Sequence, residues 1–385
     1  MNSQMPADAD LVLIGGGHSH VHVIKAFGKR PEPGIRVTLI ARDLETPYSG
    51  MLPGVIAGLY DRERAHIDLV KLTSATGTRL VHAEAIGLNR DRKQVLLSGA
   101  PPVPYDIAAI DVGITPNLQQ IAGAAEHALA VKPIGDFLRK FDDLRRRCRE
   151  PAGPRRIAVI GGGAGGVELL LAVRSRLRAE AAGDRRDPDA FSFALVTDGE
   201  ILATHGVRVR QAFRRIFRTS GVALHEHRRA RTIEAERIEF DEGPALAADA
   251  ALVSTAAAPP SWFADTGLAR DEGGFLAAGP TLQVLNDPDV FASGDCAGLV
   301  ETPREKSGVI AVRAGPPLAT NLRRRARGQP ARCWRPQPRH LALISTGERY
   351  AVASRGWFKT EGAWVWAVKD WIDRRWIGAY QDMAP

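Results

Sequence analysis

The chain has 385 residues, which is too long for one ordinary hydrophobic core and predicts two domains or slightly more. Its composition, 44% hydrophobic and 25% charged, is typical of a soluble globular protein and excludes a disordered or fibrous one. Its 52 basic side chains exceed its 44 acidic ones, for a net charge of +8. No nucleic-acid-binding module accompanies this excess, so we expect a solvated arginine-rich surface and no nucleic-acid partner.

The N-terminus and the lack of a long apolar run indicate where in the cell the protein is located. Residues 1–10 carry no basic side chain before the first strand, unlike a secretory signal, and no run of about 18 apolar residues predicts a spanning helix. The sequence therefore predicts a cytoplasmic protein, with peripheral attachment to the inner face of the cell membrane left open.

The three cysteines are far apart in the sequence, which excludes a local C-x-x-C pair for metal or redox chemistry.

The chain opens with a strand, a glycine turn and a helix. Residues 11–14 are apolar and precede Gly15-Gly16-Gly17, and residues 21, 24 and 27 then follow helical spacing. Pro31 to Gly34 ends this helix, and residues 35–40 predict the second strand of a βαβ unit.

The first glycine turn predicts a phosphate site. Gly15 and Gly17 fill two positions of G-x-G-x-x-G, where the backbone and the helix N-terminus face a pyrophosphate, with His18 and Ser19 lining it. His20 replaces the third glycine, and we expect it to pack between helix and sheet. We expect no metal at these histidines, because a third ligand is missing. The strand-end position that usually holds the ribose is Ala41, so either Asp43 takes this role or the ribose is held another way.

A second βαβ unit follows a short connecting region. Residues 93–97 and 105–111 predict a hairpin or short sheet that completes the first unit. The second unit has a strand at 157–160, a helix at 167–178 and a strand at 191–196, and residues 237–240 and 250–254 predict its closing strands.

The second glycine turn matches the dinucleotide fingerprint at all three positions. Gly161, Gly163 and Gly166 follow the apolar strand directly and predict an NAD(P) site. Thr197 and Asp198 stand at the ribose-selecting position. An acid there favours NADH, whereas nearby Arg208 and Arg210 permit the 2′-phosphate of NADPH; the sequence favours NADH only slightly.

A third motif indicates the class of protein to which the chain belongs. Residues 289–295 form a short strand that ends in Gly294-Asp295, and this segment resembles the second flavin fingerprint of the pyridine nucleotide-dependent flavoprotein superfamily. In that family the aspartate contacts the ribityl chain and phosphate of FAD, which implies this role for Asp295. The order of the three motifs implies an NAD(P) domain, residues 126–258, inserted into a discontinuous FAD domain, residues 1–125 and 259–332, with a C-terminal segment at 333–385.

The resemblance narrows at residues 46–54 and 306–309, which are similar to the type II NADH dehydrogenase-like branch and, more closely, to flavoprotein modules fused to selenide, water dikinase. In relatives, residues matching 50–52 lie along the flavin, and the helix that opens at Ser307 points its N-terminus at the ring. The resemblance implies catalytic roles for Glu168, which would face the nicotinamide, and for Lys306. It implies further FAD contacts at Ser49, Gly50, Met51, Gly113, Gly294, Gly308 and Val309.

The sequence defines the electron acceptor less clearly than it defines the cofactors. Disulfide reductases of this superfamily relay electrons through a cysteine pair beside the flavin; the chain has none, and we expect Cys296 to be a packed thiol. Quinone-using relatives carry an Ala-Gln-x-x-x-Gln stretch, where this chain has Gly308, Val309 and Arg313, which counts against a quinone.

Residues 364–379 predict an amphipathic helix. Trp364, Trp371 and Trp376 share one stripe with Val365, Val368 and Ile372, and Lys369, Asp370, Asp373 and Arg374 lie opposite. The stripe predicts either an interfacial membrane helix or packing against the flavin domain or a second subunit as a homodimer. The two acids favour packing or dimerisation.

Together these features predict an α/β fold with two Rossmann-like domains and a short C-terminal α/β segment. The expected activity is hydride transfer from NAD(P)H to FAD, followed by electron transfer to a small quinone-like acceptor without a redox disulfide. Two alternatives stay open: a reductase of a selenium or sulfur species, and a redox-sensing flavin or NAD(P) binding protein without turnover.

Overall fold

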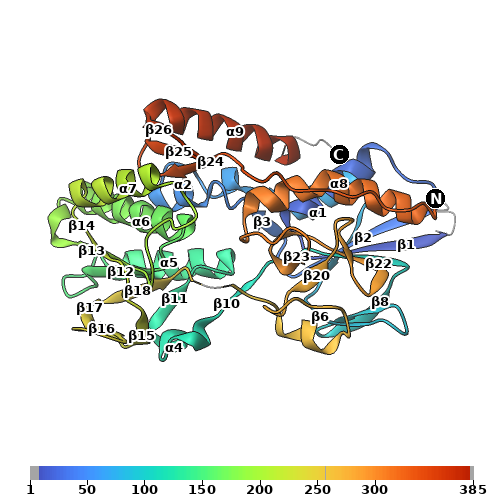
Figure 1. Ribbon diagram of the computed structural model, residues 1–385, viewed down its shortest axis with the longest axis horizontal. Helices are drawn as coiled ribbons and strands as arrows, with labels where there is room; N and C mark the ends of the chain where they lie inside the picture. The colour runs from blue at the N-terminus through green and yellow to red at the C-terminus, as the bar shows by residue number, and fades with distance from the viewer. Residues whose placement is uncertain (1–7, 256, 382–385) are drawn as a thin grey trace.

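The computed structural model describes residues 8–255 and 257–381, which form two lobes joined along one side by the C-terminal helix (Figure 1). Each lobe is built on a twisted sheet whose central strands are parallel, which confirms the predicted α/β class.

The first lobe contains an eight-stranded sheet assembled from both ends of the motif-bearing region. Its order is β23 (Ala297–Leu299), β20 (Leu276–Ala278), β21 (Gln283–Val284), β22 (Asp287–Ala292), β9 (Ile107–Ile110), β1 (Ala9–Ile14), β2 (Ile35–Ala41) and β5 (Arg79–His82). From β22 to β5 the strands are parallel, and β21 pairs antiparallel with β20 and β22. Residues before position 111 and after position 275 therefore share one sheet.

Two layers cover this sheet. On one face, a buried core packs it against α1 (His18–Lys29), α3 (Leu69–Thr76) and α8 (Gly308–Ala326). On the other face, the core includes apolar side chains of the antiparallel sheet β6 (Ala85–Asn89), β7 (Gln94–Leu97) and β8 (Ala100–Pro104). Residues 93–97 and 105–111 do not form the predicted hairpin: β7 pairs with β8 in the antiparallel sheet, whereas β9 completes the first βαβ unit beside β1.

The second lobe repeats this plan. Its sheet is fully parallel, in the order β11 (Ala128–Ala130), β18 (Ala250–Val253), β12 (Arg156–Ile160), β13 (Ser192–Val196) and β14 (Val222–His225). Helices α5 (Ile134–Arg147), α6 (Ala164–Gly183) and α7 (Val207–Thr219) share the core on one face. The other face packs on the antiparallel sheet β15 (Ala230–Ile233), β16 (Arg237–Phe240) and β17 (Leu246–Ala247). Residues 237–240 were thus wrongly expected in the parallel sheet, whereas residues 250–253 do close it.

Short elements connect the lobes. The strands β10 (Thr115–Pro116) and β19 (Ala257–Ala258) pair where the chain passes between them. Strands β3 (Glu45–Pro47) and β4 (His66–Asp68) pair with each other, and between them α2 (Leu52–Ala57) packs Ile56 into the core of the second lobe. α4 (Ala124–His127) follows the first crossing. The boundaries at 125/126, 258/259 and 332/333 stay predictions.

The C-terminal segment folds as a three-stranded antiparallel sheet and a long helix. The sheet comprises β24 (Ala342–Ser345), β25 (Ala351–Arg355) and β26 (Phe358–Gly362), and α9 (Ala363–Gln381) lies across both lobes (Figure 1). Among the described residues, no helix combines the length and apolar character needed to cross a bilayer.

The predicted orientation of this helix is wrong. Its buried residues are Val365, Lys369, Asp373, Ile377 and Tyr380, so two of the charges expected outside face the protein. Trp364, Val368, Trp371 and Ile372 are exposed, with 60% of Trp371 accessible. Lys369 and Asp373 can be buried because they form an ion pair of 2.6 Å with each other, one helical turn apart. Of the three tryptophans in the predicted stripe, Trp376 packs on the first lobe, whereas Trp364 and Trp371 do not.

Candidate functional site: two dinucleotide cradles and a helical cover

The first glycine turn has the backbone geometry of a phosphate cradle. Gly15 has φ +92°, and a Cβ there would lie 2.4 Å from the carbonyl oxygen of Asp111, so no other residue fits without strain. Gly17, which has no side chain to cap α1, precedes a helix N-terminus whose Ser19 N–H donates to the Asp111 carboxyl at 2.9 Å, so this terminus has the donors that bind an anion. The buried His20 ring supports the turn from beneath, because its Nδ1 donates to the Gly15 carbonyl at 2.7 Å.

Unpaired polar atoms gather near this turn. His18 Nε2, Ser293 Oγ and Asp295 Oδ1 are buried and have no hydrogen-bond partner among the described residues. Burial without a partner costs free energy, so these atoms are the ones that a bound molecule would satisfy. With the glycine turn, they fit the pyrophosphate and ribityl chain of FAD. Burial lowers the pKa of His18 to about 4, so its ring is neutral near pH 7.

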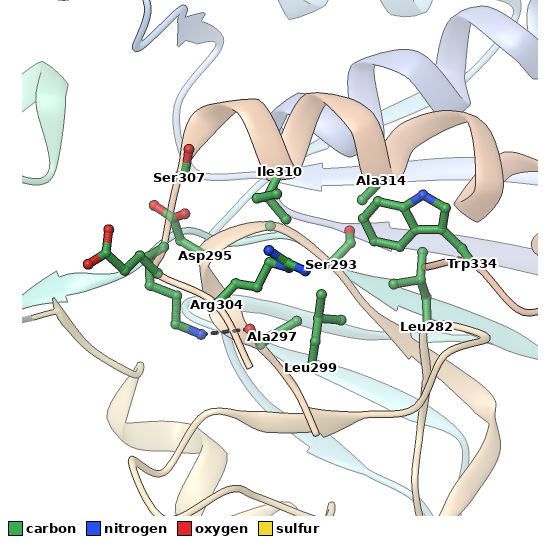
Figure 2. A pocket seen from close by; sticks show the side chains of 13 residues that line it. Leu282, Ser293, Asp295, Ala297, Leu299, Arg304, Ser307, Ile310, Ala314 and Trp334 are labelled. Carbon is green, nitrogen blue, oxygen red and sulfur yellow. Dashed lines mark hydrogen bonds between the residues drawn. The ribbon is translucent and has the colours of Figure 1, made fainter. Parts of the chain in front are cut away.

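Two of the predicted flavin segments line one pocket, shown in Figure 2. Gly294 and Asp295 approach from the end of β22, and Ile310 and Ala314 of α8 project toward the same space. Ser307 caps α8 by accepting from the backbone N–H of Val309 at 3.3 Å. Asp295 is held by Lys132 at 2.6 Å, which orients its carboxylate across the crossing between the lobes.

The segment at residues 48–51 also reaches this region. A Cβ on Gly308 would lie 2.4 Å from Ser49 Oγ, so the two segments touch, and Met51 is buried. Gly113 adopts φ +75°, a conformation that favours glycine, and a Cβ there would meet no atom within 4 Å.

Two predicted residues point elsewhere. Asp43 is exposed and pairs with Arg42 at 2.8 Å. Lys306 donates to the carbonyl of Ala297 at 2.6 Å, and its ammonium lies 3.8 Å from the centre of the Phe275 ring. A ribose contact of Asp43 and a catalytic role of Lys306 would each require the side chain to leave these partners.

At the second glycine turn, two glycines are sterically required and the other one lies beside open space. A Cβ on Gly166 would lie 2.0 Å from the Gly161 carbonyl oxygen, and one on Gly161, where φ is +131°, would lie 2.7 Å from the Ser254 carbonyl. A Cβ on Gly163 would meet no atom within 4 Å. The first and third glycines are therefore required by the fold, whereas the second leaves space for a nucleotide to approach.

The residues near the expected ribose position differ in accessibility. Thr197 is buried at the end of β13, and Asp198 is exposed beside it. Arg210 was predicted as a possible contact for a 2′-phosphate, but it is paired with Glu200. Arg214 forms an ion pair with the same carboxylate at 3.0 Å. Arg208 is exposed.

Glu168 connects the second lobe to the C-terminal segment through hydrogen bonds. Its Oε1 accepts hydrogen bonds from the backbone N–H and the hydroxyl of Ser345, at 2.7 and 2.9 Å. Burial raises the pKa of the Glu168 carboxyl, and the nearby positive charge of Lys369 opposes this rise.

Lys369 connects this point to the flavin segment. Its ammonium donates to the Gly50 carbonyl at 2.5 Å and pairs with Asp373. Tyr48 stacks on Trp376 of α9 at 4.2 Å between ring centroids, and the His18 ring packs edge-on to Tyr48. Helix α9 thus covers residues 48–50. Ser345 and Lys369 carry no sequence signal as site residues, because only the tertiary fold brings them there.

Two of the three thiols are buried. Cys296 is buried and donates to the carbonyls of Ser293 and Ile110, at 3.2 and 3.4 Å, and burial raises its pKa to about 12. Cys148 is also buried, and burial raises its pKa to about 11. In the part of the chain that the structure describes, no group of three or more His, Cys, Asp or Glu side chains could hold a metal ion.

Comparison with known proteins agrees with this geometry. The model of the family "pyridine nucleotide-disulphide oxidoreductase" matches residues 9–321. The NADH dehydrogenase-like protein YutJ of Bacillus subtilis is 23% identical over 299 residues, covering 76% of this chain and 78% of YutJ. Demethylphylloquinone reductase NdbB of Synechocystis is 24% identical over 236 residues, covering 59% of this chain and 56% of NdbB.

Solved structures share the fold. The sulfide:quinone oxidoreductase of Aquifex aeolicus superposes with a TM-score of 0.81 over 97% of this chain and 92% of that one, at 16% identity. The closer likeness to modules fused to selenide, water dikinase stays a prediction. From the motifs, the two cradles and the family match, the chain belongs to the pyridine nucleotide-disulphide oxidoreductase family and is an FAD-dependent oxidoreductase that uses NAD(P)H, and its likeness to YutJ is consistent with the type II NADH dehydrogenase-like branch.

Proposed function

We propose that this enzyme passes electrons from NAD(P)H to a lipophilic, quinone-like acceptor that approaches along α9. FAD supplies the redox chemistry, since it takes hydride from the nicotinamide and delivers electrons to the acceptor. The observation that carries the proposal is the two-sided character of α9. Its inner face holds Lys369 against Gly50 of the flavin segment, and its outer face exposes Trp364, Val368, Trp371 and Ile372. A lipophilic acceptor gathers at such an apolar surface.

The protein residues have distinct parts in this proposal. Gly161, Gly163 and Gly166 bind the nicotinamide dinucleotide at the N-terminus of α6, and Gly15, Gly17 and Asp295 bind FAD. Glu168, fixed by Ser345, positions the nicotinamide end of the site. Lys369, whose charge is balanced by Asp373, holds the Gly50 carbonyl and so fixes the backbone of the flavin segment. The exposed acid Asp198 and the pairing of Arg210 with Glu200 favour NADH over NADPH.

The thiols argue against a reductase that relays electrons to selenium or sulfur through cysteine. The chain has three cysteines, all in the described part, and Cys148 and Cys296 are buried with raised pKa values. A thiolate is the form that attacks a sulfur or selenium centre, and neither buried residue supplies it near pH 7.

The outer face of α9 also suggests where the enzyme works. The loop between β25 and β26 adds Trp357, 81% exposed, with Phe358 beside Arg339 and Arg355. Tryptophan with arginine neighbours is the composition of a surface that binds anionic lipid, in which quinones dissolve. We propose peripheral contact with the membrane through this face.

The membrane proposal is tested by sedimentation with anionic vesicles. The variant Trp364→Ser/Trp371→Ser should lose binding, and Leu285→Ser, which removes an exposed apolar side chain from the first lobe, should keep it. A protein that ignores vesicles but sediments as a dimer, and becomes monomeric in the double variant, would assign the face to a homodimer instead.

The activity is tested under anaerobic conditions. NADH should bleach the flavin absorbance, and menadione or ubiquinone-1 should restore it faster than selenite or oxygen. Bleaching without restoration by either quinone would exclude the proposed acceptor. Absence of bleaching with both NADH and NADPH would exclude hydride transfer.

A further inference from the structure

The two nucleotide-binding lobes differ at one equivalent position. In each lobe the strand beside the first strand ends next to the glycine turn: β9 ends before Asp111 and β18 before Ser254. The N–H of Asp111 donates to Ile14 at 2.9 Å, and that of Ser254 donates to Ile160 at 2.9 Å. Both carbonyls face the first glycine of their turn. The NAD(P) lobe therefore has a neutral side chain where the FAD lobe has a carboxyl.

The Asp111 carboxyl lies inside the FAD cradle. It is buried, and its Oδ2 accepts from the backbone N–H of Ser19, in the first turn of α1, at 2.9 Å. A Cβ on Gly17 would lie 2.1 Å from its Cγ, and one on Gly294 would lie 2.2 Å from its Oδ1. Asp111 thus touches two predicted FAD segments and uses a helix N-terminal donor of the kind that binds pyrophosphate. The corresponding space at Gly163 is open.

The surroundings do not neutralise this group. Among the described residues, no lysine or arginine pairs with Asp111: Lys132 pairs with Asp295, and Lys306 donates to a carbonyl. The other titratable groups near it are Asp295, Cys296, His18 and His20; both rings and the thiol are uncharged near pH 7. A dinucleotide would add two negative charges at the same helix terminus, where a carboxylate and a pyrophosphate repel each other strongly in a buried site.

We propose that Asp111 makes FAD binding proton-linked: the cofactor binds tightly when this carboxyl carries a proton and weakly when it is ionised. Asp111 is a positioning residue, since as a neutral acid it still contacts Gly17 and Gly294 but no longer competes with the pyrophosphate. Burial, with a smaller contribution from the charge of Asp295, already raises the pKa of Asp111 to about 7 before any cofactor is present. Bound pyrophosphate raises it further. Binding above pH 7 must therefore take up one proton.

The test measures FAD affinity, not turnover, and is independent of the acceptor. The full chain, stripped of FAD with potassium bromide, is titrated with FAD between pH 6 and 9 by flavin fluorescence. The dissociation constant should rise about tenfold per pH unit above about pH 7. Asp111→Asn keeps the acceptor for Ser19 N–H and should bind with little pH dependence. Asp91→Asn, in an exposed turn of the same lobe, should behave as the wild type.

A purely structural role for Asp111, as a cap for α1, gives a different result: affinity of the wild type would not change with pH, and this outcome overturns the proposal. An equal slope in wild type and Asp111→Asn also overturns it. If the variant does not fold, calorimetry of the wild type at pH 8 in two buffers of different ionisation enthalpy decides. Uptake of about one proton per FAD supports the linkage, and uptake near zero refutes it.

Discussion

The buried ion pair on α9 gives a sharp test of the structure. The side chains of Lys369 and Asp373 are 11% and 6% exposed, and the ammonium also serves the Gly50 carbonyl. Replacing Lys369 by Met removes the cation and leaves a carboxylate buried without its counter-charge. Loss of one partner of a buried pair costs about 3 to 5 kcal/mol. The free energy of unfolding should fall by this amount.

The same helix supplies the control. Arg374 and Asp370 have the same i, i+4 spacing, but their side chains are 47% and 20% exposed. Water screens this pair, so Arg374→Met should cost less than about 1 kcal/mol. The double variant Lys369→Met/Asp373→Leu removes both buried charges and should recover most of the loss, because an apolar pair of similar size can replace a buried ion pair.

Urea unfolding of the full chain, followed by tryptophan fluorescence, measures all three variants against the wild type. The decisive comparison is Lys369→Met against Arg374→Met. Equal destabilisation would mean that α9 does not bury Lys369, and the orientation of the helix would then be wrong.

Three further predictions concern the two cradles and the thiols. Gly166→Ala should lower the melting temperature and abolish NADH binding measured by calorimetry, because its Cβ would lie 2.0 Å from a carbonyl oxygen. Gly163→Ala places its Cβ in open space, so it should weaken NADH binding but leave the melting temperature unchanged. Because the pKa of Asp111 is raised to about 7, the cofactor-free protein should lose stability as pH rises from about 4 to 7, by up to about 4 kcal/mol, and Asp111→Asn should remove that slope in urea titrations. Iodoacetamide should label the exposed Cys333 of the native protein at pH 8, and mass spectrometry should find the buried Cys148 and Cys296 unmodified until the chain unfolds.

The features that the sequence predicted correctly are local. The strands at 11–14, 35–40 and 157–160 are short apolar runs followed by glycine turns or loops, and the structure contains each of them as β1, β2 and β12 with small shifts of their ends. Backbone requirements at Gly15 and Gly161 are also local, because a positive φ beside a neighbouring carbonyl admits only glycine. Local patterns were therefore sufficient to locate both glycine turns.

The errors concern partners that are distant in sequence. The strand at 107–110 has the same apolar character whether it pairs with residues 94–97 or with β1, and only the closing of the large sheet decides between them. Asp111 follows that strand, so its place beside Gly17 and Gly294 could not be inferred until the strand itself was placed. Residues 237–240 were assigned to the wrong sheet for the same reason.

The orientation of α9 shows how one ion pair can reverse an amphipathic pattern. Burying the tryptophan stripe would stabilise the chain by its apolar area, but it would leave Lys369 away from the Gly50 carbonyl and Asp373 away from Tyr48. The observed orientation keeps these polar contacts inside and retains Trp376, Ile377 and Tyr380 as apolar contacts with the first lobe. Trp364 and Trp371 stay exposed, which leaves an apolar surface in contact with water. The helix that covers the flavin segment therefore also carries the apolar face for which we propose membrane contact, so binding at that face would act on the same helix that holds Lys369 against the Gly50 carbonyl.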